Sequence, residues 1–168
     1  MILTLTPTGL RAGRRTLPCT VGRGGVVADK REGDGATPAG VHRIVGVAYR
    51  ADRMARPAPW AAAIGPRDLW CDDPGSVHYN QLTKLPFSGS AERMRRADRL
   101  YDLVLLTDWN WPDAVPGRGS AIFLHRWRRA GYRTEGCVAM AASDLVWLCG
   151  RVAPGTRLVV PEGLAGRA

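Results

Sequence analysis

Long apolar runs are missing from this sequence. No stretch of about 18 apolar residues occurs, so no segment is expected to cross a membrane. The N-terminus, residues 1–7, lacks both the basic region and the apolar region of a secretory signal. These two absences predict a cytoplasmic protein that has no membrane as a partner.

Cysteine pairs at metal-binding spacing are also missing. Cys19, Cys71, Cys137 and Cys149 form no C-x-x-C motif, and no histidine lies at zinc-finger spacing from any of them. The three histidines and the scattered carboxylates show no metal-ligand spacing, and no phosphate-binding loop is present. The sequence therefore predicts no metal and no cofactor. Disulfides are not expected in a reducing cytosol, and three of the cysteines are expected to be small buried side chains.

Acidic residues are few beside basic ones. The chain has 15 Asp and Glu against 24 Lys and Arg, a net charge of +9. Such a balance suits nucleic acids, anionic membranes or acidic small substrates. The basic residues are spread over residues 14–15, 93–99 and 126–133 without one long tract. We interpret them as a solvated basic surface and expect no nucleic-acid partner.

The residue patterns predict one domain, residues 1–168, that is mostly β with a few short helices. Apolar residues make up 45% of the chain, and the 20 glycines and 12 prolines indicate many turns. Strands are expected at residues 2–6, 16–21, 26–28, 41–49, 101–109, 121–125 and 156–160. The segment 101–109 is apolar enough to be central, and residues 156–160 are expected to close the sheet. Residues 30–38 are interpreted as a loop and residues 51–65 as irregular.

Two short helices are expected. Ser90 is a suitable N-cap for a helix over residues 90–96, and Ser143 for a second one, with Asp144 in its first turn. The second helix has apolar residues at i, i+3, i+4 and i+7, which predicts a buried stripe. These residues are Leu145, Leu148, Cys149 and Val152.

The segment 120–140 carries the candidate chemistry. An apolar strand ends on His125, a short loop follows, and Gly136-Cys137 lies just before the second helix. A thiol needs a nearby base to attack, and imidazole can take the thiol proton and later give one to a leaving amine. The amides near Gly136 and Cys137 are placed to hold an oxyanion. The alternative is that Cys137 is a buried structural thiol and His125 a hydrogen-bonded residue at a strand end.

Several motifs together resemble a known family. They are Leu124-His125, Thr134-Glu135-Gly136-Cys137-Val138-Ala139-Met140, Asp144-Leu145, Gly155-Thr156-Arg157-Leu158-Val159-Val160 and, upstream, Gly35-Ala36-Thr37-Pro38-Ala39-Gly40. The chain resembles the YkuD-type L,D-transpeptidases from about residue 16 to residue 160. In this chain His125 precedes Cys137, whereas in papain-like peptidases the cysteine precedes the histidine.

The resemblance implies a β-sandwich with the catalytic cysteine in a cleft. It implies an acyl-enzyme formed at the L,D bond after the third residue of a peptidoglycan tetrapeptide stem, so the partner is a peptidoglycan-derived peptide or muropeptide. By position, Cys137 matches the nucleophile, His125 its base, and Gly136 the glycine beside the oxyanion site.

Two positions depart from the family pattern. Thr134-Glu135 stands where the common motif has Ser-His, and Ala139 stands where an arginine is frequent. Thr134 is a candidate substrate contact. Glu135 either orients a base or holds an ammonium group of the substrate, or it is a hydrogen-bonded loop residue. The Thr-Glu-Gly-Cys motif is similar to that of short, signal-less relatives.

Three other candidate substrate contacts can also be read as structural residues. Tyr79 and Asn80 follow a turn, where they either contact substrate or support the turn. Arg126 either attracts the carboxylates of a stem peptide or is a solvated loop residue. His42, in an alternating strand, is interpreted as structural.

Three functions remain open on the sequence. The preferred one is a cytoplasmic L,D-carboxypeptidase that releases D-alanine from tetrapeptides during muropeptide recycling. The second is an L,D-transpeptidase that forms cross-links, which differs only in the acceptor of the acyl group. The third is a non-catalytic basic binding module.

Overall fold

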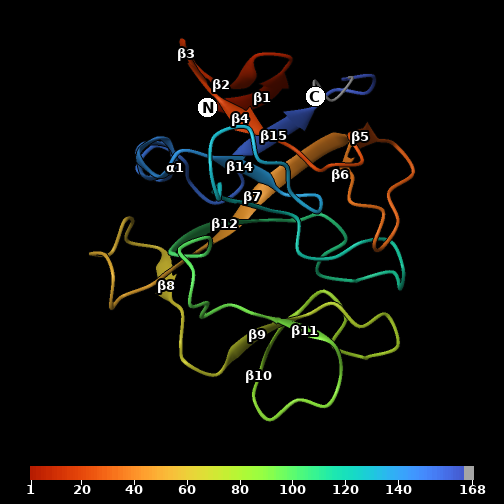
Figure 1. Cartoon of the computed structure of the whole chain (residues 1–168). Helices are drawn as coiled ribbons and strands as arrows, with labels where there is room; N and C mark the ends of the chain where they lie inside the picture. The colour runs from red at the N-terminus through yellow and green to blue at the C-terminus, as the bar shows by residue number, and fades with distance from the viewer. Residues whose placement is uncertain (165–168) are drawn as a thin grey trace.

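The computed structural model describes residues 1–164 and is mostly β, as predicted, with one short α-helix in that part of the chain (Figure 1). The strands are β1 (Ile2–Thr6), β2 (Gly9–Ala12), β3 (Arg15–Leu17), β4 (Cys19–Thr20), β5 (Val26–Val27), β6 (Thr37–Pro38), β7 (Gly40–Tyr49), β8 (Ala61–Ala63), β9 (Asp68–Cys71), β10 (Leu82–Lys84), β11 (Ala91–Arg93), β12 (Leu103–Thr107), β13 (Phe123–Arg126), β14 (Val138–Met140) and β15 (Arg157–Val160). The helix is α1 (Ala142–Cys149).

A large sheet of ten strands holds most of these elements. Its order is β3-β2-β1-β15-β7-β12-β13-β14-β4, and β8 pairs with β7 outside this path. The predicted central strand is confirmed, since β12 lies between β7 and β13. β15 also lies inside the sheet, between β1 and β7, and does not close it as expected. Two small sheets, β10-β9-β11 and β5-β6, complete the fold, and Figure 1 shows the first of them at the end opposite β1–β3.

The predicted helix over residues 90–96 is wrong. Residues Ala91–Arg93 form β11, which pairs antiparallel with β9 in the register Glu92↔Trp70. A single N-cap residue stabilises a helix by about 1 kcal/mol, which a strand ladder with a buried neighbour such as Met94 outweighs. The sequence also does not predict β9, nor β8 and β6, which lie in the segments interpreted as irregular and as a loop. Each of these strands has only two to four residues.

The second predicted helix exists, but Ser143 does not cap it. The N-cap position is Ala141, which makes no side-chain capping bond, and Asp144 in the first turn pairs with Arg15 at 2.8 Å. Leu145, Leu148 and Cys149 form the predicted buried stripe of the helix, and Val152 is buried too but lies after the helix has ended at Cys149. Another difference is that the expected strand over residues 16–21 divides into β3 and β4 around Pro18, which has no N–H to give to a ladder.

The alternation of side chains along β13 divides the core in two. Leu124 points to one face, where it joins Leu105 and the buried residues of α1 in a large apolar cluster. Phe123 points to the other face and joins a smaller cluster that includes Cys137. Successive residues of a strand face opposite sides, so the same sheet builds the main core and, on its other face, the floor of a pocket.

Leu105 provides a test of this arrangement, because it lies fully buried on β12. Leu105→Ala is expected to lower the free energy of unfolding by about 2–5 kcal/mol, through lost apolar burial and the cavity left behind. Leu82→Ala is the matched control, since Leu82 is 54% exposed on β10 and its loss is expected to cost about 0.5 kcal/mol or less. Urea unfolding of both variants measures the difference, and equal losses would contradict the placement of β12 at the centre.

Candidate active site

The pairing of β13 with β14 brings the candidate residues together. The two strands run parallel, with Leu124 opposite Val138 and His125 opposite Ala139. Because side chains alternate along strands, Cys137, two residues before Ala139, falls on the same face as His125. The small Ala139 side chain opposite His125 leaves space beside the imidazole ring, and all three residues line one pocket.

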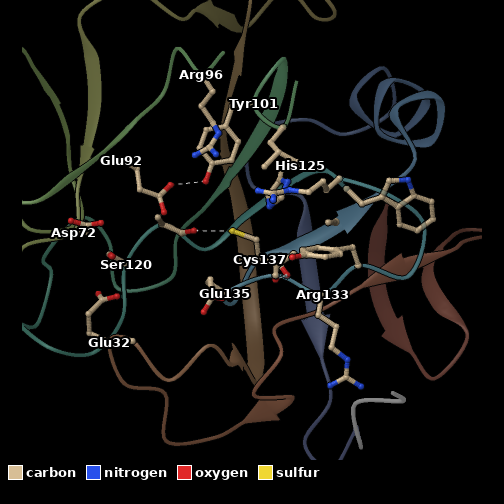
Figure 2. Close-up of a pocket in the computed structure, with 18 residues that line it drawn as sticks. Glu32, Asp72, Glu92, Arg96, Tyr101, Ser120, His125, Arg133, Glu135 and Cys137 are labelled. Atoms are coloured by element: carbon tan, nitrogen blue, oxygen red, sulfur yellow. Dashed lines mark hydrogen bonds between the residues drawn. The ribbon is translucent and has the colours of Figure 1, made fainter. Parts of the chain in front are cut away.

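The pocket has a volume of about 440 Å³ and contains charges of both signs. Glu32, Asp72 and Glu92 form one part of its lining. Arg96, Arg128 and Arg133 also line it. Figure 2 shows His125 and Cys137 in this pocket, the three carboxylates together on one side, Arg96 next to Tyr101 and Arg133 on another side. The candidate nucleophile therefore lies in a pocket that has three carboxylates on one side and arginines at separate places in its lining.

The Cys137 sulfur is held between two backbone groups. It donates a hydrogen bond to the Ala121 carbonyl oxygen at 3.0 Å, and the Phe123 N–H donates to it at 3.4 Å. The residue is only 8% exposed, and burial raises the pKa of the thiol to about 12. In the resting state the sulfur is therefore a protonated thiol at neutral pH.

His125 is held in one tautomer by the backbone. Its Nδ1 lies 2.7 Å from the Arg126 carbonyl oxygen, which can only accept, so Nδ1 carries the proton and Nε2 has a free lone pair. Burial lowers the pKa of the imidazole to about 4. The ring also packs edge-on against Tyr101, with centroids 5.4 Å apart. His125 is thus a neutral imidazole that is ready to accept a proton.

Tyr101 and Glu92 form a second hydrogen-bonded pair in the pocket. The Tyr101 hydroxyl donates to Glu92 Oε2 at 2.6 Å, and burial raises the pKa of both groups. Asp72 is close enough to raise the pKa of Glu92 further, and its own Oδ1 is buried without a hydrogen-bond partner. Sequence reasoning missed these three residues, because none of them carries a local signal of the cavity that it faces. Glu92 lies in the short strand β11, and Asp72 and Tyr101 lie outside the strands.

Gly136 forms a turn that another residue could not form. Its φ is 142°, and a Cβ there would lie 2.8 Å from the Ala36 carbonyl oxygen. Thr134 braces the same turn: its hydroxyl donates to the Cys137 carbonyl oxygen at 2.6 Å and accepts from the Gly136 N–H at 3.1 Å. Thr134 also lines the pocket, whereas Gly136 does not. Thr134 therefore holds the Gly136 N–H and the Cys137 carbonyl from within the Thr-Glu-Gly-Cys segment, but it makes no hydrogen bond to the Gly136–Cys137 peptide group between them.

Glu135 lies at the edge of the pocket in an ion pair. Both of its carboxylate oxygens accept from Arg23 Nε, at 2.8 and 2.9 Å, and the two side chains are largely exposed. Its negative charge is thus balanced by a neighbour on the protein surface.

Tyr79 and Asn80 do not line the pocket, but they hold the segment that leads into β13. Asn80 Oδ1 accepts from the Ala121 N–H at 2.9 Å, and Ala121 is the residue whose carbonyl holds the thiol. Asn80 Nδ2 donates to the carbonyls of Trp109 and Asn110. The Tyr79 hydroxyl donates to Glu32 and accepts from the Gly119 N–H at 3.0 Å. Both side chains are buried and bound to the fold.

Arg126 contributes to the site through its backbone. Its carbonyl oxygen fixes the His125 ring, while its partly exposed side chain does not line the pocket. The arginine nearby that does line it is Arg128, which lies over the Tyr132 ring at 5.5 Å. His42 lies elsewhere, buried with Nε2 3.0 Å from the Pro38 carbonyl oxygen.

Within residues 1–164 no group of three or more His, Cys, Asp or Glu is arranged to hold a metal ion. No helix in that same part of the chain is long and apolar enough to span a bilayer. The chemistry that the pocket itself offers is a thiol, a neutral imidazole and backbone amides, which are the groups used in nucleophilic acyl transfer.

Comparison with known proteins agrees with this chemistry. A search among curated proteins gives no match to the chain. The model of the YkuD family, the L,D-transpeptidase catalytic domain, matches residues 7–160, and so takes in both β13 and β14. This match covers most of the 168 residues, and the chain belongs to the YkuD family of L,D-transpeptidase catalytic domains, cysteine enzymes that act on peptidoglycan.

Proposed function

We propose that this protein is an L,D-carboxypeptidase that removes D-alanine from tetrapeptide stems of soluble muropeptides. The observation that carries the proposal is the pocket in which a thiol and a neutral imidazole of fixed tautomer lie together. In this proposal Cys137 is the nucleophile, His125 the general acid and base, and the turn at Gly136 the oxyanion site. The cytoplasm, where soluble stems occur during recycling, is the proposed location.

The reaction follows from the protonation states of the two groups. Both are neutral at rest, so His125 Nε2 takes the thiol proton as the sulfur attacks the carbonyl carbon after the third residue of the stem. The resulting imidazolium gives that proton to the nitrogen of D-alanine as the C–N bond breaks. Water then attacks the thioester, His125 takes a proton from it, and the thiol leaves with the tripeptide carboxylate formed.

The charges in the pocket suit a substrate with both signs of charge. A stem peptide carries carboxylates that the arginines in the lining can attract, and the wall of Glu32, Asp72 and Glu92 suits an amino group. Glu135, already paired with Arg23, is left as a contact at the edge of the pocket. Thr134 is proposed to contact the stem from the turn that it braces.

Water is the preferred acceptor because it needs no site of its own. A volume of about 440 Å³ lies within the range of small-ligand pockets and accommodates one short peptide beside the sulfur. Cross-linking, the alternative, requires a second peptide to reach the same thioester.

The product distinguishes the two acceptors. Incubation with a tetrapeptide stem is expected to give free D-alanine and the tripeptide by mass spectrometry. Cys137→Ala is expected to abolish both products, whereas Cys19→Ala, outside the pocket, is expected to retain them. A cross-linked dimer without free tripeptide would show that the acceptor is an amine.

The pH profile tests the buried imidazole. A base must be neutral to take a proton, and burial lowers the pKa of His125 from 6.5 to about 4. The acid limb of kcat/KM for the tetrapeptide is therefore expected near pH 4, with nearly constant rates from pH 7 down to pH 5. A fall of about tenfold between pH 7 and pH 5.5 would mean that His125 titrates as an exposed histidine and would contradict this site.

A further inference from the structure

The hydroxyl of Thr37 connects two segments that lie far apart in the sequence. It donates to the Gly136 carbonyl oxygen at 2.7 Å and accepts from the Gly22 N–H at 2.9 Å. Thr37 is only 1% exposed and begins β6, outside the pocket lining. Its two hydrogen bonds reach the residue that immediately precedes the candidate nucleophile.

Holding the Gly136 carbonyl fixes the orientation of the next amide. The Gly136–Cys137 peptide is trans, so the Cys137 N–H points away from the carbonyl oxygen that Thr37 holds. Glycine at φ 142° gives this peptide plane more rotational freedom than another residue would. An external anchor is therefore needed to keep the N–H in one direction.

The segment around Thr37 is itself firmly attached to the turn. The Ala36 carbonyl oxygen packs against Gly136 so closely that a Cβ there would lie 2.8 Å away. The residues on either side of Gly22, which is bound to Thr37, are attached to the turn as well. The Arg23 N–H donates to the Thr134 carbonyl oxygen at 2.8 Å, and the Thr134 N–H donates to the Val21 carbonyl oxygen at 3.2 Å. The hydroxyl of Thr37 thus acts from a rigid support on a plane that would otherwise rotate.

We propose that Thr37 is a positioning residue of the oxyanion site, which aims the Cys137 N–H at the oxygen of a carbonyl under attack by the sulfur. The inference rests on the proposed acyl transfer but not on the identity of its peptide substrate. An oxyanion donor works only if it is already aligned when the charge develops, so a freely rotating plane loses much of the stabilisation. Thr37 touches no reacting atom and acts through Gly136.

The test compares acylation with alkylation of the same sulfur. Acylation by p-nitrophenyl acetate passes through an oxyanion, whereas alkylation by iodoacetamide displaces iodide at a saturated carbon and forms none. Thr37→Val keeps the shape of the side chain and removes the hydroxyl. It is expected to slow acylation of Cys137 about 10- to 100-fold, followed by p-nitrophenolate release and intact mass. Alkylation is expected to stay within about threefold of wild type, with an unchanged pH dependence.

Two further variants complete the design. Thr37→Ser restores a hydroxyl and is expected to recover most of the acylation rate, and Cys137→Ala gives the background to be subtracted. If Thr37→Val does not fold by circular dichroism, Thr37→Ala and Thr37→Ser are compared in the same two reactions. Parallel loss of acylation and alkylation, or no loss of acylation, would overturn the proposal, as would a wild-type protein that is alkylated but never acylated.

Failure of the proposed function gives a different result. A wild-type protein that leaves the tetrapeptide intact, yet is acylated by p-nitrophenyl acetate in a manner dependent on Thr37, refutes the carboxypeptidase and supports the role of Thr37. Release of D-alanine by wild type and Thr37→Val at equal rates supports the carboxypeptidase and refutes the positioning role of Thr37.

Discussion

The parallel pairing of β13 with β14 is the constraint on which the candidate site depends. Its register places His125 opposite Ala139, and strand alternation then places Cys137 on the same face as the imidazole. A shift of one residue would turn Cys137 into the main apolar core, where Val138 now lies. The register is strongly specified, because Leu124, Val138 and Met140 are all buried in that core. The packing of one face therefore sets the chemistry of the other.

Burial decides the electrostatic character of the site. The same desolvation raises the pKa of Cys137 to about 12 and lowers that of His125 to about 4. A thiolate and imidazolium pair is therefore not the resting state, and the proton must move as the carbonyl arrives. A protonated, buried sulfur also reacts slowly with oxidants, since the thiolate is the reactive form. The Ala121 carbonyl contributes to this resting state by accepting the thiol hydrogen bond.

Much of the framework was predictable from the sequence, because long strands carry their own pattern. Residues 41–49 and 101–109 alternate or are uniformly apolar, and they form the adjacent strands β7 and β12. The short strands β2, β6, β8, β9, β10, β11 and β14 were missed, because two to four residues hold too little pattern. In β11 the local signal of Ser90 favoured a helix instead. The stripe of α1 was predicted in part, since Leu145, Leu148 and Cys149 are its buried residues but the helix ends at Cys149, before Val152.

The candidate site was only partly predictable, because sequence does not tell where a side chain points. Motif order predicted Cys137 and His125 in one site, and both line the same pocket. Asn80, in contrast, is turned into the fold, where it accepts from the Ala121 N–H. Arg126 acts through its carbonyl, and a backbone contribution leaves no mark on residue type. Glu92 faces the pocket from a strand that the sequence did not reveal.

Glu135 shows how this chain accommodates a departure from the common family motif. An acidic residue beside the nucleophile would disfavour negative charge on the sulfur, but here Arg23 neutralises it at 2.8 Å. An exposed pair of this kind contributes about 0–1 kcal/mol to stability, so stability alone does not explain it. Arg23 follows Gly22, whose N–H is bound by Thr37, and the Arg23 N–H is bound by Thr134. The ion pair between Arg23 and Glu135 therefore joins, on the surface, the same two segments that Thr37 joins in the interior. Because Glu135 replaces the histidine of the common motif, His125 is the one histidine among the residues that line the pocket.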